Sequence, residues 1–258
     1  MPVAGALYYH LNQGAETELP VVLLHGAGGM HLSWPPEIRR LPGYRVYALD
    51  LPGHGKSDQV GGLQSIAAYA QRIQAWLEAV DLSGAIFVGH SMGGAIALEM
   101  ALQFPDQVLG LGLISTGARL RVHPDLLAAA DSPTTFYNAI ETIVSWSFSP
   151  QASPRMTELV RQRLGEVRPS VLHGDLSACD RFDASEALEK VACPVLVVCG
   201  TEDRMTPLRS SQFLAGQIPQ TQLVTIQDAG HMVMLEQPQA TAAALAAFLQ
   251  TIPHQGEL

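Results

Sequence analysis

Cysteine is scarce in this sequence, which has only Cys179, Cys193 and Cys199 among its 258 residues. Three thiols cannot all pair with one another, and their spacing is not that of zinc ligands. We therefore expect reduced thiols that pack as small hydrophobic side chains, and no metal site. Because disulfides are rare in the cytoplasm, the same scarcity predicts a cytoplasmic protein.

Positive charge is scarce too. Lys and Arg number 15 against 24 Asp and Glu, which gives a formal net charge of −9. Without a basic block or a basic amphipathic face, nucleic acid and anionic membranes are disfavoured as partners. The sequence also lacks the charged and apolar regions of a signal peptide, and its apolar runs are too short to span a bilayer. We expect no signal peptide and no stable membrane insertion; the oligomeric state stays open.

The sequence is rich in short apolar runs without polar alternation, which is typical of strands buried on both faces of a parallel sheet. The expected strands are residues 6–11, 21–24, 46–49, 85–88, 108–114, 195–198 and 223–226. The expected helices between and after them are residues 65–80, 95–104 and 238–249. This alternation predicts an α/β fold with a mostly parallel, doubly wound sheet in one main domain.

The alternation of strands and helices stops after Thr116. Three helix-like pieces separated by prolines follow, at residues 125–130, 134–146 and 154–164. We interpret residues 118–184 as a helical cap whose apolar side forms a substrate pocket over the strand ends; additional core is the alternative. The two segments that remain, residues 1–117 and 185–258, would form the α/β core.

A glycine-flanked serine stands between an expected strand and an expected helix, in the run Gly-His-Ser-Met-Gly at residues 89–93. A strand, a tight turn that exposes Ser91 and then a helix would make a nucleophile elbow. The first free N–H groups of that helix, Met92 included, would lie where an oxyanion forms. The plainer interpretation is a glycine-rich turn with an incidental serine.

A second glycine-rich loop follows the expected strand at residues 21–24. Its sequence, His-Gly-Ala-Gly-Gly at residues 25–29, lets the backbone approach a ligand closely. The N–H of Ala27 or of Gly28 could therefore point at developing negative charge. A dinucleotide fingerprint is excluded because the position that it requires to be glycine is His31.

The loop at residues 50–58 contains Gly-Lys-Ser but is no phosphate-binding P-loop, because Asp50 occupies the position of the leading glycine. We interpret it as structural support at the rim of the site, with charges that are mostly solvated or cap the next helix. We expect His25 and His54 to bond to loop backbone, and the His90 side chain to point away from the adjacent serine.

A serine, an acid and a histidine are expected to meet where the parallel strands end. Parallel strands place their carboxyl ends at one edge, so the loops with Ser91, Asp203 and His231 should converge there. Among nine histidines, His231 is the one in the loop directly after the last expected strand, and it also lies after the acid. Asp203 is the preferred acid, and Glu202 and Asp228 rank below it.

The segments LLHGAGG, DLPGHGKSD, GHSMGG, GTEDRMTP and DAGHMVMLEQP together resemble those of α/β-hydrolases of the carboxylesterase and lipase type with a small cap. The resemblance extends over nearly the whole chain. It implies the α/β-hydrolase fold and the order serine, acid, histidine.

The expected activity is hydrolysis of short- or medium-chain carboxylic esters through an acyl-enzyme intermediate. His231 would take the proton of the Ser91 hydroxyl while Asp203 fixes the tautomer of the imidazole. The N–H groups of Ala27 and Met92 would bind the oxyanion, and no metal or organic cofactor is required.

We assign substrate contacts to Gly28, Trp146 and Met232, and expect a small-molecule ester as the partner. One alternative is hydrolysis of an enol-lactone or a vinylogous C–C bond, since residues 146–150 faintly resemble a segment of enol-lactonases. Another is a small-molecule receptor that kept the three residues without useful turnover.

Overall fold

One eight-stranded sheet organises the protein in the computed structural model, which describes residues 2–14 and 19–252. The strand order is β1-β2-β4-β3-β5-β6-β7-β8. The strands are β1 (Val3–Ala4), β2 (Leu7–Asn12), β3 (Val21–Leu24), β4 (Val46–Leu49), β5 (Ala85–His90), β6 (Val108–Ile114), β7 (Val195–Gly200) and β8 (Thr221–Ile226). At one edge β2 pairs antiparallel with both β1 and β4, and all neighbours from β4 to β8 run parallel. The predicted fold class is confirmed.

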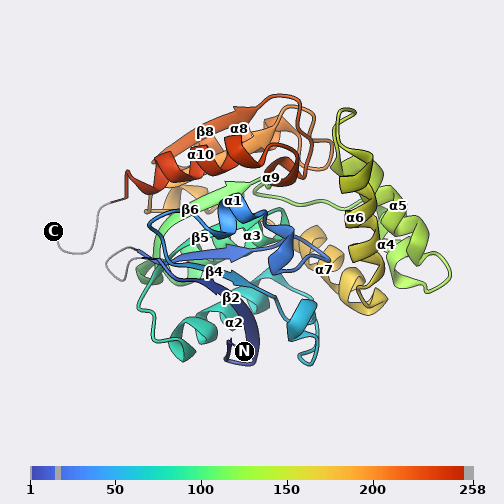
Figure 1. Cartoon of the computed structure of the whole chain (residues 1–258), viewed down its shortest axis with the longest axis horizontal. Helices are drawn as coiled ribbons and strands as arrows, with labels where there is room; N and C mark the ends of the chain where they lie inside the picture. The colour runs from blue at the N-terminus through green and yellow to red at the C-terminus, as the bar shows by residue number, and fades with distance from the viewer. Residues whose placement is uncertain (1, 15–18, 253–258) are drawn as a thin grey trace.

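Helices cover both faces of the sheet, as Figure 1 shows with α2 below it and α10 above it. They are α1 (Pro36–Arg39), α2 (Ile66–Ala79), α3 (Met92–Gln103), α8 (Leu208–Gln217), α9 (Val233–Glu236) and α10 (Pro238–Leu249). The central strand β3 explains the two layers, because Val22 and Leu24 pack with α2 and α3 while Val21 and Leu23 pack with α1 and α10. Side chains of a strand alternate between faces, so an unbroken apolar run fills two cores at once.

Four helices lie between β6 and β7, and in Figure 1 they stand at the right of the sheet. They are α4 (Pro124–Asp131), α5 (Phe136–Ser147), α6 (Pro154–Gly165) and α7 (Pro169–Arg181), called the inserted helices below. They share an apolar cluster of their own, which includes Phe136, Ile140, Leu164 and Leu172. The helical nature of the segment agrees with the predicted cap, and the division into core and cap domains stays a prediction.

The inserted helices begin and end at neighbouring points. Arg119 and Asp183 form an antiparallel bridge, and their side chains form an ion pair with Nε 2.7 Å from Oδ2. The Ala184 N–H also donates to the Ala118 carbonyl at 2.9 Å. We call this paired segment the stem of the insertion.

Two long helices, α7 and α8, were not expected from the sequence, and neither were the four-residue helices α1 and α9. Helix α7 turns Val171, Leu172, Leu176 and also Asp175 inward, so a carboxylate interrupts its apolar stripe. Helix α8 buries only Ser211 and Leu214, which leaves almost no periodic signal. Helical periodicity reveals a helix only where its buried face is apolar.

In the described residues, no helix has the length and apolar character needed to cross a membrane.

Candidate active site

Ser91 occupies a strained turn between β5 and α3, with φ 53° and ψ −116°. Such a backbone conformation costs about 1–3 kcal/mol and persists only where the surroundings hold it. The Ser91 N–H donates to the Ile114 carbonyl at 3.0 Å, and the Thr116 hydroxyl donates to the Ser91 carbonyl at 2.8 Å. A Cβ at Gly89 or at Gly93 would overlap backbone atoms, so only glycine allows strand and helix to approach so closely.

His231 and Asp203 contact each other in the loops after β8 and β7. His231 Nδ1 lies 3.1 Å from Asp203 Oδ2, and both residues are buried. Thr206 joins the pair, because its hydroxyl donates to Asp203 Oδ2 at 2.8 Å and lies 3.2 Å from His231 Nδ1. Burial alone would raise the pKa of Asp203, but the attraction of His231 and the hydrogen bonds from His231 and Thr206 hold that pKa below its usual value.

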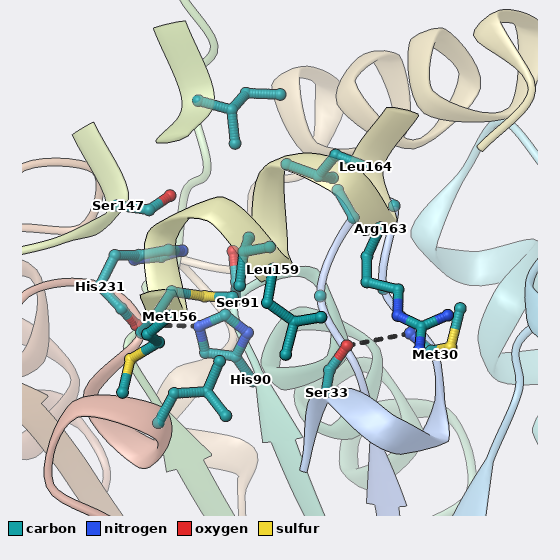
Figure 2. A pocket seen from close by; sticks show the side chains of 18 of the residues that line it. Met30, Ser33, His90, Ser91, Ser147, Met156, Leu159, Arg163, Leu164 and His231 are labelled. Carbon is teal, nitrogen blue, oxygen red and sulfur yellow. Dashed lines mark hydrogen bonds between the residues drawn. The ribbon is translucent and has the colours of Figure 1, made fainter. Parts of the chain in front are cut away.

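A cavity of about 530 Å³ brings Ser91 and His231 together. Figure 2 shows both side chains in it, together with Met156, Leu159 and Leu164 of α6. The other apolar lining residues are Met30, Leu32, Ile143, Val160, Leu176, Met205, Met232 and Leu235. The loops at the strand ends thus supply Ser91 and His231. The inserted segment supplies much of the apolar wall and also the polar residues Ser147, Ser153, Arg155 and Arg163.

The loop after β3 offers one free amide to this cavity. The Gly28 N–H is engaged, because it donates to Asp175 Oδ2 at 2.9 Å. Among the described residues, neither the Ala27 N–H nor the Met92 N–H has an acceptor. Of the two amides considered in that loop, Ala27 is therefore the one available to a ligand, and it lines the cavity.

The structure separates the candidate acids clearly. Asp203 is buried against His231, whereas Glu202 and Asp228 are exposed. Sequence position alone could not distinguish these three carboxylates, since all lie in loops at the same edge of the sheet.

Of the three residues predicted to contact substrate, Gly28 and Met232 line the cavity and Trp146 does not. Among the described lining residues, α5 contributes Ile143 and Ser147, not Trp146. The Trp146 ring is 36% exposed and packs edge-on against His123, with 6.4 Å between ring centroids. Trp146 thus lies outside this cavity, because α5 turns its neighbour Ser147 toward the cavity instead.

His90 supports His231 from below. Its Nε2 donates to the His231 carbonyl at 2.9 Å, and the two ring centroids are 4.8 Å apart. Burial, followed by the nearby His231, lowers the pKa of His90 to about 3, so the ring is a neutral donor. The expectation that His90 only points away from the serine missed this contact.

The inserted helices also bond to the loop that holds His231. Glu236 accepts the Gly230 N–H at 2.8 Å and the Ser149 N–H at 3.0 Å. The Met232 N–H donates to the Ser147 carbonyl at 3.0 Å. Of the two neighbours of His231, Met232 is thus bonded to the last residue of α5, and Gly230 is linked through Glu236 to Ser149, just after that helix.

The loop at residues 50–58 is less solvated than expected. Asp50 is fully buried, where it accepts the Lys56 N–H at 2.9 Å and contacts His31 Nδ1 at 2.8 Å. His25 does bond to backbone, since Leu51 N–H donates to its Nε2 at 3.0 Å. His54 contacts the Pro52 carbonyl at 3.0 Å but also the Asp175 carboxylate at 2.8 Å, which the sequence did not indicate.

The three cysteines are free thiols, two of them buried, and burial raises the pKa of Cys193 and Cys199 to about 11. Within residues 2–14 and 19–252, no group of three or more His, Cys, Asp and Glu side chains is arranged to hold a metal ion.

Comparison with known proteins places this geometry in a family. The family model described as "alpha/beta hydrolase fold" matches residues 20–238. The chain therefore belongs to the alpha/beta hydrolase family.

Individual relatives agree with that class. The chain is 30% identical over 243 residues to a pimeloyl-[acyl-carrier protein] methyl ester esterase of Neisseria meningitidis, covering 89% of this chain and 92% of that protein. It is 29% identical over 248 residues to the protein ABHD8 of Bos taurus, covering 92% of this chain but only 57% of that protein, so it spans little more than half of this relative. A solved esterase from Thermogutta terrifontis, with malate bound, superposes with a TM-score of 0.86 at 27% identity and covers 96% of this chain and 94% of that one.

Proposed function

We propose that this protein is a serine hydrolase that cleaves carboxylic esters of short to medium acyl chain length through an acyl-enzyme intermediate. The main support for the proposal is that Ser91 and His231 line one cavity while His231 Nδ1 contacts the buried carboxylate of Asp203. This is the spatial order that nucleophile, base and orienting acid require.

Each residue then has a defined step. Ser91 Oγ attacks the carbonyl carbon of the ester as His231 Nε2 takes the hydroxyl proton, and Asp203 stabilises the imidazolium that forms. The oxyanion is bound by the N–H groups of Ala27 and Met92, where the loss of one such donor costs about 3 kcal/mol. The C–O bond to the alcohol breaks as His231 protonates the leaving oxygen, and water repeats the cycle to release the acid.

The chain-length assignment depends on the cavity. Its volume of about 530 Å³ and its wall of leucine, methionine, valine and isoleucine suit an apolar acyl group. Gly28 and Met232 contribute to substrate binding in this proposal. The similarity to a pimeloyl-[acyl-carrier protein] methyl ester esterase supports ester hydrolysis as the reaction.

The test is turnover of p-nitrophenyl acetate, butyrate, octanoate and dodecanoate by the purified protein. We expect hydrolysis of all chain lengths that fit, with butyrate and octanoate best, and covalent labelling of Ser91 by a fluorophosphonate, detected as a mass increase of its peptide. Ser91→Ala should lose both. Binding of esters without turnover or labelling would favour a receptor, and turnover of lactones alone would favour the lactonase alternative.

A further inference from the structure

Asp175 is a fully buried carboxylate that the reaction itself does not use. It lies on α7, one of the inserted helices, and accepts hydrogen bonds from three separate parts of the α/β core. Gly28 N–H donates to its Oδ2 at 2.9 Å, His54 Nε2 lies 2.8 Å from the same oxygen, and the Tyr69 hydroxyl donates to its Oδ1 at 2.6 Å. One side chain thus joins the inserted helices to the loop that holds Ala27.

The ring of His54 bridges a backbone carbonyl and the Asp175 side chain. Its Nδ1 lies 3.0 Å from the Pro52 carbonyl and its Nε2 lies 2.8 Å from the Asp175 carboxylate. Facing a carbonyl and a carboxylate, both ring nitrogens act as donors, which is the imidazolium form. Burial alone would lower the pKa of His54, but Asp175 and the two hydrogen bonds raise it above the usual value. The carboxylate is therefore neutralised internally and held by a rigid set of donors.

The contact with Gly28 decides which amide can serve a ligand. Because Asp175 takes the Gly28 N–H, the adjacent Ala27 N–H is left as the donor of that loop. The inserted helices also pack closely against this loop and leave no room for a side chain at residue 28. A Cβ there would lie 2.7 Å from Leu164 Cδ2 and 3.2 Å from Leu172 Cδ1. With φ 65° at Gly28, the loop has a conformation that larger residues rarely adopt.

We propose that Asp175 is a positioning residue for ester hydrolysis: it fixes the loop of Ala27 in the oxyanion-binding conformation and makes that conformation depend on docking of the inserted helices. The inference rests on the proposed function. A second set of bonds, from Glu236 to Ser149 and Gly230, ties the same inserted helices to the loop of His231. The inserted helices thereby hold the loops on both sides of Ser91.

The experiment compares Asp175→Asn and Asp175→Ala with a matched control on the same helix. Asp180→Asn makes the same chemical change in another α7 carboxylate, one that accepts the Val122 N–H at 3.1 Å and does not contact the loop of Ala27. For each protein we would measure kcat and KM with p-nitrophenyl butyrate, the inhibition constant of butylboronic acid, the inhibition constant of butyrate and the thermal midpoint of unfolding. The boronic acid becomes a tetrahedral anion on Ser91 and so reports oxyanion binding, whereas butyrate reports ground-state binding.

We expect kcat to fall about tenfold in Asp175→Asn and about a hundredfold in Asp175→Ala, with KM and butyrate binding changed less than about threefold. The boronic acid should weaken by the same factor as kcat, and Asp180→Asn should match the wild type. If Asp175→Ala does not fold, Asp175→Asn decides the outcome. Wild-type kcat and boronate affinity in Asp175→Asn, even with a lowered thermal midpoint, would reduce Asp175 to a structural residue and overturn the inference alone. A wild-type protein without ester turnover would overturn the proposed function as well.

Discussion

Two of the buried pairs of aspartate and histidine, Asp203–His231 and Asp175–His54, differ in which ring nitrogen faces the carboxylate. Asp203 contacts Nδ1 of His231, and no described residue bonds to the Nε2 of that ring, which lines the cavity. Asp175 contacts Nε2 of His54, whose Nδ1 is taken by the Pro52 carbonyl. The first ring can accept a proton from a ligand-facing hydroxyl, and the second cannot. A short Asp–His contact is therefore not enough to define a base; the free nitrogen and its surroundings decide.

The same substitution in the two rings gives the largest contrast. His231→Gln should lower kcat for p-nitrophenyl butyrate by on the order of 10⁵-fold, because the Ser91 hydroxyl loses its base, with little change in unfolding free energy. His54→Gln should instead lower the unfolding free energy by about 3 kcal/mol, because a buried ion pair is broken, and keep kcat within about tenfold. Steady-state kinetics and urea unfolding of both variants measure this, and equal loss of turnover in both would contradict the distinction.

Replacing the acid of the first pair should have the next largest effect. Asp203→Asn should lower kcat by about 10³- to 10⁴-fold, because an amide in that place favours the wrong tautomer of His231. The exposed neighbours supply controls: Glu202→Gln and Asp228→Asn should keep wild-type kcat within about twofold. A damaging control beside an active Asp203→Asn would move the orienting role to another carboxylate.

Acid should destabilise the protein through histidines that are buried without a carboxylate partner. Burial, then the nearby His54, lowers the pKa of His25 to about 4, and burial lowers that of His90 to about 3, against 6.5 in the unfolded chain. At a pH between the folded-state pKa and 6.5, each of these rings binds more protons in the unfolded state than in the folded state. The unfolding free energy should therefore fall as the pH drops below 6.5, by about 1.4 kcal/mol per pH unit for each ring. Urea unfolding at a series of pH values measures the slope. His90→Gln should reduce it, and an unchanged slope would contradict this origin.

His54 makes the opposite contribution, since its pKa is raised. The stability it provides is complete below pH 6.5 and is lost as the pH rises through its folded-state pKa.

Thr206 offers the smallest and most local change. Its hydroxyl donates to Asp203 Oδ2 and lies 3.2 Å from His231 Nδ1, so Thr206→Val should loosen the pair without removing either partner. We expect kcat to fall about tenfold at unchanged KM, measured with p-nitrophenyl butyrate, and Thr206→Ser to restore it. A fall in Thr206→Ser equal to that in Thr206→Val would assign the effect to packing of the methyl group.

The sequence predicted those parts of the protein that local chemistry determines. The apolar runs located the strands, and the glycines around Ser91 indicated a turn that the backbone angles now describe. The positions of Asp203 and His231 after successive strands predicted their meeting, because parallel strands place their loops at one edge.

The rest depends on contacts between distant segments. Helix α7 was missed because Asp175 places a carboxylate on its buried face. The hydrogen-bond partners of Asp175 are 106 to 147 residues away in the chain. Trp146 and Ser147 are adjacent, so no periodicity could tell which of them faces the cavity. Thr206 had a local signal, since an aspartate in a turn commonly accepts backbone N–H groups just ahead of it, as Asp203 does from Met205 and Thr206.

The stem formed by Arg119 and Asp183 has a consequence for how this architecture can vary. The inserted helices begin and end at this paired segment. A replacement insertion of another length or helix content could therefore start and end there without altering the spacing between β6 and β7. The residues that select the substrate can therefore be changed separately from those that react. An insertion grafted at the stem would replace the apolar wall and keep Ser91 and His231. The graft would again have to present a hydrogen-bond acceptor to the amide of residue 28.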